Sequence, residues 1–120
     1  MLKKIAFTKA ETYEPQKEWK RTSLCNEESI SIEHFIKPAG HSSPKHEHPA
    51  DQVLVVLEGK IGVETDVEKV ELLQGDAVFI PGGESHIVHN PEVSPAVGLD
   101  IFVPGRSFDF WLKRGLSEEK

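Results

Sequence analysis

The amino-acid sequence predicts an all-β fold, a small sandwich or barrel, from the way glycine and proline divide the chain. Nine glycines and eight prolines are spread over 120 residues, and the short segments between them are rich in valine, isoleucine and phenylalanine. Few of these segments exceed eight residues, which is typical of strands in sandwiches and barrels. A chain of this length suffices for one compact domain and is too short for two of ordinary size. We therefore expect a single domain over residues 1–120.

In chain order, the segments predict nine strands and two short helical stretches. The strands are expected at residues 2–7, 19–24, 30–37, 52–58, 60–64, 69–73, 77–80, 85–89 and 96–103. Glu58-Gly59 predicts a tight turn between the fourth and fifth strands, and Thr65-Asp66 predicts the next one. Helix is indicated only over residues 10–18, which Pro15 interrupts, and over residues 109–116.

Charge and composition exclude several classes of partner. Twenty acidic against fourteen basic side chains give a formal charge of −6, and no run of Lys or Arg is longer than Lys3-Lys4, so we expect no nucleic acid or anionic membrane as a partner. The longest apolar run, residues 53–57, is far below the roughly 18 to 20 residues that cross a bilayer. The N-terminus lacks the apolar stretch of a secretory signal. The single cysteine, Cys25, excludes an intrachain disulfide and is interpreted as a small buried apolar residue. These features favour a cytoplasmic protein.

Three of the six histidines, His41, His46 and His48, fall within eight positions. Side chains two residues apart in an extended segment point to the same face, so His46 and His48 can both reach one metal ion at about 2 Å. Taken alone, this pair is equally compatible with two solvated histidines on a loop.

The residues around this pair resemble the two sequence motifs of the cupin superfamily, small β-barrels that hold a divalent metal. The first motif, over residues 40–59, is similar to the family pattern at Gly40, His46, His48, Gln52 and Gly59. The second, over residues 75–90, is similar to it at Gly75, Pro81, Gly83, His86 and Asn90. All spacings agree, and the one departure in identity is Gln52, where the family usually has Glu. The resemblance implies a cupin barrel of the jelly-roll type, also described as a double-stranded β-helix.

Carried over residue by residue, the resemblance implies His46, His48, Gln52 and His86 as ligands of one divalent metal ion. His41 and His89 do not occupy ligand positions. The donor set admits Ni, Mn, Fe, Co, Cu or Zn. A neutral amide in place of a carboxylate leaves the metal its full double charge, which favours Lewis-acid chemistry and an anionic ligand over redox cycling. Alternatively, Gln52 is not a ligand and the site has three histidines with open positions.

The last predicted strand, residues 96–103, carries an aspartate among apolar side chains. A buried carboxylate without partners is costly, so Asp100 faces water, pairs with a cation or lines a polar cavity. In a cavity shared with the metal it would be a general acid or base, and Phe102 would be an apolar wall for a sugar ring. Arg106 follows the strand and could grip a carboxylate. Alternatively, Arg106 is a surface residue that forms an ion pair with Asp109 or Glu92.

Residues 100–106, with 108–110 behind them, also resemble the tail of the KdgF-type cupins, which convert 4,5-unsaturated monouronates into linear keto acids. This second resemblance implies Asp100, Phe102 and Arg106 as catalytic residues and agrees with three histidines and a glutamine at the metal. The sequence thus favours a metal-dependent enzyme on a small anionic sugar acid, of the lyase or isomerase type. A metal-dependent dioxygenase and a non-catalytic carbohydrate-binding cupin remain the alternatives.

The sequence also predicts a homodimer. An isolated small barrel leaves sheet edges and an apolar outer face. The N-terminal strand and a set of aromatic side chains exceed what one small core requires. These aromatic residues are Trp19, Phe108, Phe110 and Trp111.

Overall fold

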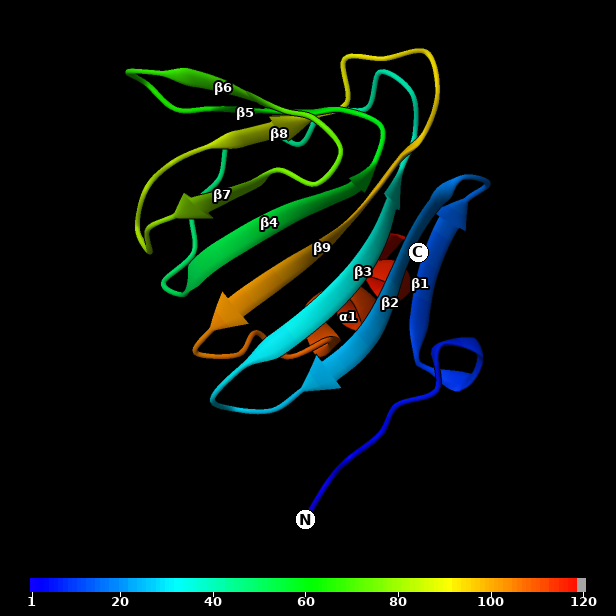
Figure 1. Cartoon of the computed structure of the whole chain (residues 1–120). Coiled ribbons are helices and arrows are strands. Elements are labelled where there is room, and N and C mark those ends of the chain that lie inside the picture. Colours follow the sequence, from blue (N-terminus) through cyan, green and yellow to red (C-terminus); the bar gives the residue numbers. More distant parts are fainter. Residues whose placement is uncertain (119–120) are drawn as a thin grey trace.

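A computed structural model describes residues 1–118 of the chain, with side chains through Arg114 (Figure 1). It contains a 3-10 turn, η1, at Phe7–Lys9, nine strands and one helix. The strands are β1 (Thr12–Gln16), β2 (Trp19–Asn26), β3 (Ser31–Lys37), β4 (Asp51–Glu58), β5 (Ile61–Glu64), β6 (Lys69–Leu72), β7 (Ala77–Ile80), β8 (Ile87–His89) and β9 (Ala96–Val103), and the helix is α1 (Asp109–Glu118). The predicted all-β class is confirmed.

The strands form two antiparallel sheets that face each other. The larger has six strands in the order β1-β2-β3-β9-β4-β7, and the smaller has the order β6-β5-β8. In Figure 1 the smaller sheet lies over β4, β7 and part of β9. The core between the sheets consists of buried apolar side chains, namely Phe35, Leu54, Val56, Ile61, Val63, Leu72, Ile80 and Ala96. This is a jelly-roll barrel.

Glycine permits the close packing of this core at one central position. Gly98 on β9 lies opposite Phe35 on β3, and a Cβ atom built on Gly98 would lie 2.4 Å from Phe35 Cζ. Because no side chain fits there, the phenylalanine ring can cross over β9 and fill the barrel.

Strand register places polar residues in the interior next to this core. Glu33 on β3, Asp100 on β9 and Leu54 on β4 lie in one row across the sheet. The neighbouring row contains Phe102 and Gln52. Because side chains alternate between the faces of a strand, these residues all point into the barrel. Asp100 is therefore an interior residue of a central strand, with 3% of its surface exposed, and the alternative that it faces water is wrong.

Helix α1 lies behind β2 and β3 in Figure 1 and joins the sheet through a second cluster of aromatic side chains. Tyr13 on β1 stacks on Trp111 with ring centroids 5.2 Å apart, and Phe108 is buried beside them. The helix expected at residues 109–116 is confirmed, and it extends the sheet's inner surface with aromatic groups. It is the one helix of the described residues and is too short to span a membrane.

The N-terminal prediction was wrong. Residues 2–6 are not a strand, and residues 12–16, within the segment where a helix was expected, form β1. Pro15 cannot continue a helix, while the positive φ of 68° at Glu18 allows a tight turn between β1 and β2. The resulting hairpin buries Tyr13 against Trp111, a contact that the local sequence does not reveal.

Candidate metal centre

Two loops bring three histidines together. His46 and His48 lie in the loop before β4, and His86 lies just before β8. His46 and His86 exchange backbone hydrogen bonds of 3.0 and 2.8 Å. As a result, one nitrogen of each of His46, His48 and His86 lies within 4.8 Å of the others. This spacing suits imidazole donors around one ion.

The glycine pair of the second motif holds the two loops against each other. The N–H of Gly83 donates to the carbonyl of His48 over 2.8 Å. A Cβ atom on Gly82 would lie 2.2 Å from the carbonyl oxygen of Pro49. The loop that carries His86 can therefore approach the loop that carries His48 only because residue 82 has no side chain.

Backbone carbonyls fix the orientation of all three rings. His46 Nδ1 lies 2.8 Å from the carbonyl oxygen of Pro44, His48 Nδ1 lies 2.9 Å from that of Ala50, and His86 Nδ1 lies 2.7 Å from that of Glu84. A carbonyl only accepts, so each Nδ1 donates, and a neutral ring then keeps its lone pair on Nε2. Such a bond on the far nitrogen is the usual support of a metal-binding histidine.

The surroundings favour neutral rings at two of these positions. Burial lowers the pKa of His46, and the neighbouring imidazoles lower it further. Burial also lowers the pKa of His86, again with a contribution from His48. Neutral imidazole is the form that binds metals.

Gln52 places an amide oxygen beside the three histidines. Its Nε2 group donates to Asp100 Oδ1 over 2.7 Å, which turns its Oε1 atom toward His48 Nε2 at 2.9 Å. With a neutral His48, that contact joins two lone pairs with no proton between them. His86 Nε2 is buried and has no hydrogen-bond partner among the described residues. A divalent cation satisfies all of these atoms at once, so the donor set fits the metal that the sequence predicted.

Asp100 connects the donors to a buried ionic cluster. Arg21 on β2 contacts Asp100 Oδ2 at 2.5 Å and Glu33 Oε1 at 3.3 Å. Arg106 Nη2 contacts the two oxygens of Glu33 at 3.1 and 3.2 Å. The indole N–H of Trp111 donates to Glu33 Oε1 over 2.7 Å. Two arginines and two carboxylates thus compensate one another inside the barrel.

Phe102 and Arg106 lie at the border between this cluster and the histidines. The ring of Phe102 is 5.3 Å from that of His48, and the Arg106 guanidinium carbon is 4.1 Å from the same Phe102 ring. Arg106 is therefore not a surface residue paired with Asp109 or Glu92. Burial lowers its pKa, and its Nε atom is buried without a hydrogen-bond partner in the described part of the chain.

Sequence reasoning missed Arg21 and Glu33. Glu33 carried a signal, because it interrupts an alternating strand as Asp100 does, at a position that is 1% exposed. No such signal marked Arg21, because β2 contains a bulge and its buried and exposed side chains do not alternate clearly.

His41 and His89 lie outside the group of three that could hold a metal. His41 Nδ1 contacts Lys37 Nζ at 2.9 Å, and its ring packs on Trp19. His89 packs its ring against Gly62.

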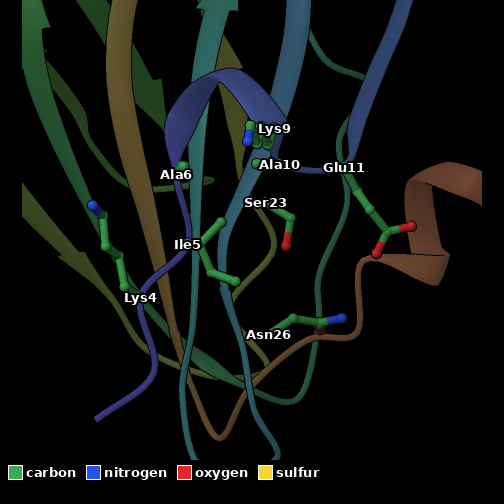
Figure 2. A pocket seen from close by; sticks show the side chains of 8 residues that line it. All are labelled: Lys4, Ile5, Ala6, Lys9, Ala10, Glu11, Ser23 and Asn26. Carbon is green, nitrogen blue, oxygen red and sulfur yellow. The ribbon is translucent and has the colours of Figure 1, made fainter.

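A surface hollow of about 430 Å³ lies between the N-terminal segment and β2 (Figure 2). Its lining residues include Lys4, Lys9, Glu11 and Asn26. None of the three clustered histidines contributes to it, so we place the functional site in the barrel and not in this hollow.

Comparisons with known proteins agree with this geometry. In sequence, the chain is 33% identical over 73 residues to the JmjC domain-containing histone demethylation protein 1 of Yarrowia lipolytica, a match that covers 58% of this chain and 14% of that protein. It is 26% identical over 81 residues to an uncharacterized protein of Streptomyces coelicolor, covering 68% of this chain and 76% of that one. The chain thus spans about a seventh of the first relative.

Two solved structures share the fold over most of the chain. An RmlC-like cupin from Shewanella frigidimarina has a TM-score of 0.78 at 24% identity, with 92% of this chain and 96% of that one covered. KdgF from Halomonas sp. has a TM-score of 0.79 at 22% identity, with 92% and 99% covered. The family model described as "Cupin domain" matches residues 33–102, more than half of the chain. With both motifs, the barrel and the three histidines in place, the chain belongs to the cupin family.

Proposed function

We propose that this cupin is a metal-dependent enzyme that linearises 4,5-unsaturated uronates, as the resemblance of its tail to KdgF-type cupins implies. The observation that carries the proposal is the buried Asp100 and Arg106 beside a set of four neutral donors. A divalent ion held by neutral donors keeps its charge, and Arg106, whose charge Glu33 offsets, still offers guanidinium N–H groups nearby. An acidic protein thereby creates a local site for a small anion.

The reaction is an isomerisation and needs no oxidant. A proton leaves the hydroxyl on C1, and the bond between C1 and the ring oxygen breaks to give the aldehyde. The ring oxygen then belongs to an enolate, which takes up a proton at C4 and becomes the ketone at C5, so one proton is released and one is taken up. The bound metal would supply Lewis-acid polarisation of substrate oxygens.

The chain's own residues fit the remaining tasks. Asp100 accepts from Gln52 and Arg21, and a carboxylate has about four lone-pair positions, so it can still take up and return a proton. Arg106 uses one nitrogen, Nη2, for Glu33 and keeps other donors for the substrate carboxylate. Phe102 is 1% exposed between His48 and Arg106, and its ring holds the Arg106 guanidinium in place by a cation–π contact.

The experiment follows the ultraviolet absorbance of the C4=C5 bond of an unsaturated galacturonate. We expect metal-loaded protein to speed its loss well beyond the spontaneous rate. At saturating metal, with metal content verified, Asp100→Asn should lower kcat by about 100-fold or more. The control Asp66→Asn changes an exposed carboxylate and should leave the rate intact.

No acceleration with any divalent metal of the admitted set would refute the proposal. Oxygen consumption during turnover of another small substrate would instead identify a dioxygenase. Binding of the sugar acid without turnover would identify a carbohydrate-binding cupin.

A further inference from the structure

We propose that Arg21 and Asp100 act as positioning residues for the metal centre, by holding the amide of Gln52 with its oxygen toward the three imidazoles. This deepens the proposed function and rests on the same metal site. It assigns a role to Arg21, which lies on another strand and contacts none of the four donors.

The argument begins with the ambiguity of an amide. The two ends of a glutamine side chain have nearly the same shape, but only the oxygen has a lone pair to offer a cation. Gln52 is 4% exposed, so bulk water does not set its orientation. Whatever contacts its outer end therefore decides whether the metal site has a fourth donor.

Asp100 contacts that outer end. Its Oδ1 atom lies 2.7 Å from Gln52 Nε2, and a carboxylate at this position requires a donor. The NH₂ group must therefore face Asp100, and Oε1 must face His48 Nε2, as observed at 2.9 Å.

Arg21 fixes the other carboxylate oxygen of Asp100, Oδ2, as a hydrogen-bond acceptor. A guanidinium can only donate, so the atom that faces Arg21 Nη1 at 2.5 Å must be an acceptor. Arg21 is itself fixed by Glu33 at 3.3 Å and by stacking on Trp111, with its guanidinium carbon 4.8 Å from the ring. Arg21 and Gln52 thus both donate to Asp100, one to each carboxylate oxygen.

This polarity makes Asp100→Asn a specific test. Arg21 will attract the oxygen of the new amide at position 100, so the NH₂ group of that amide will face Gln52. Gln52 must then turn its oxygen toward position 100 and its NH₂ group toward the imidazoles, and the metal loses a donor. We expect Co²⁺ affinity to fall by about 10- to 100-fold, at least as far as in Gln52→Leu, and the visible spectrum of bound Co²⁺ to change in both variants.

The matched variants separate this effect from general damage. In a Gln52→Leu background, adding Asp100→Asn should change Co²⁺ affinity by less than about twofold, since the two residues act in series. In Asp100→Asn, adding Gln52→Glu should restore affinity, because the carboxylate introduced at position 52 can accept from the neighbouring amide with one oxygen and face the metal with the other. Adding Arg21→Met to Asp100→Asn should also restore part of the affinity, because the amide at position 100 is then free to turn.

Unchanged Co²⁺ affinity and spectrum in Asp100→Asn would overturn the proposal, as would additive losses with Gln52→Leu. If the Arg21→Met double variant does not fold, Arg21→Lys decides: it keeps a donor, so Asp100→Asn must remain deleterious in that background. The titration uses Co²⁺ alone and the full chain, without a sugar acid. The proposal can therefore stand if uronate turnover is absent, and uronate turnover can be found if the proposal fails.

Discussion

Trp111 Nε1 donates to Glu33 Oε1 over 2.7 Å, although 78 residues separate them in the chain. The same carboxylate oxygen lies 3.3 Å from Arg21 Nη1 and 3.1 Å from Arg106 Nη2. One buried carboxylate therefore connects the C-terminal helix, strand β2 of the larger sheet and the tail that follows β9. Removing the Glu33 carboxylate should therefore weaken the contacts of all three elements.

We expect Glu33→Gln to destabilise the protein by about 3 kcal/mol, because it leaves buried guanidinium charge uncompensated. Urea unfolding of the apoprotein measures this. The matched control is Glu27→Gln, which removes one partner of the exposed pair with Lys3 and should leave the midpoint unchanged. Equal effects of the two substitutions would mean that the buried cluster is no more important than a surface ion pair.

Metal binding should stabilise the folded chain by mass action, by about 2.7 kcal/mol at a free metal concentration 100 times the Kd. We expect His86→Ala to abolish this gain in Tm, since the substitution removes one of three convergent nitrogens. His89→Ala, three residues further along the chain, should retain it because its ring lies outside the group. A metal-induced shift that survives in His86→Ala would locate the metal elsewhere.

The apoprotein should lose stability as pH falls from 6.5 toward 4. Burial, together with the positive charges of Lys37 and Arg21, lowers the pKa of His41 from 6.5 to about 4. Between these pH values His41 binds a proton in the unfolded chain but not in the folded chain, so acid favours unfolding. Above pH 6.5 the His41 ring is neutral in both the folded and the unfolded chain, so it adds no pH dependence to the stability.

The check is the pH dependence of urea unfolding in His41→Gln, which cannot titrate. We expect a shallower fall than in the parent protein, with a remaining slope from His34, His46 and His86, whose pKa values are also lowered. Parallel curves would show that His41 does not contribute.

The homodimer expected from the sequence remains a prediction, and the outer face of the larger sheet supports it. Strands β3, β9, β4 and β7 present a continuous set of apolar side chains there, with Phe79 59% and Val103 49% exposed. Half-buried members of the set are Ile32, Ile36, Val53, Val55, Val97, Leu99 and Ile101. A largely apolar face of this kind can pack on a second copy across a two-fold axis.

Sedimentation at micromolar concentration should show a dimer that Leu99→Asp converts to a monomer. Val67→Asp, in an exposed turn outside this face, should leave the dimer intact. A monomeric parent protein would contradict the prediction.

Strands β2 to β9 could be predicted within one or two residues, because glycine and proline mark the ends of most of them and apolar residues alternate within most of them. The β1 hairpin could not, because Thr12–Gln16 becomes a strand through pairing with β2 and through the stacking of Tyr13 on Trp111. The β1–β2 pairing depends on another strand and the Tyr13–Trp111 contact is long-range, so neither can be predicted from the residues of β1 alone.

The same distinction holds at the site. The histidines that cluster could be predicted because two short motifs with fixed spacing carry them. The importance of Arg21 depends on Asp100, 79 residues away, and emerges only when β2, β3 and β9 are adjacent in one sheet.

The three carbonyls that hold the imidazoles have a consequence for how the metal enters. Each carbonyl belongs to a residue two positions from its histidine, so every ring is oriented by its own short loop before any ion arrives. With the pKa values of His46 and His86 lowered by burial, those two rings favour the neutral form and release fewer protons on metal uptake than exposed imidazoles would. The heat of metal uptake should therefore depend little on the ionisation enthalpy of the buffer.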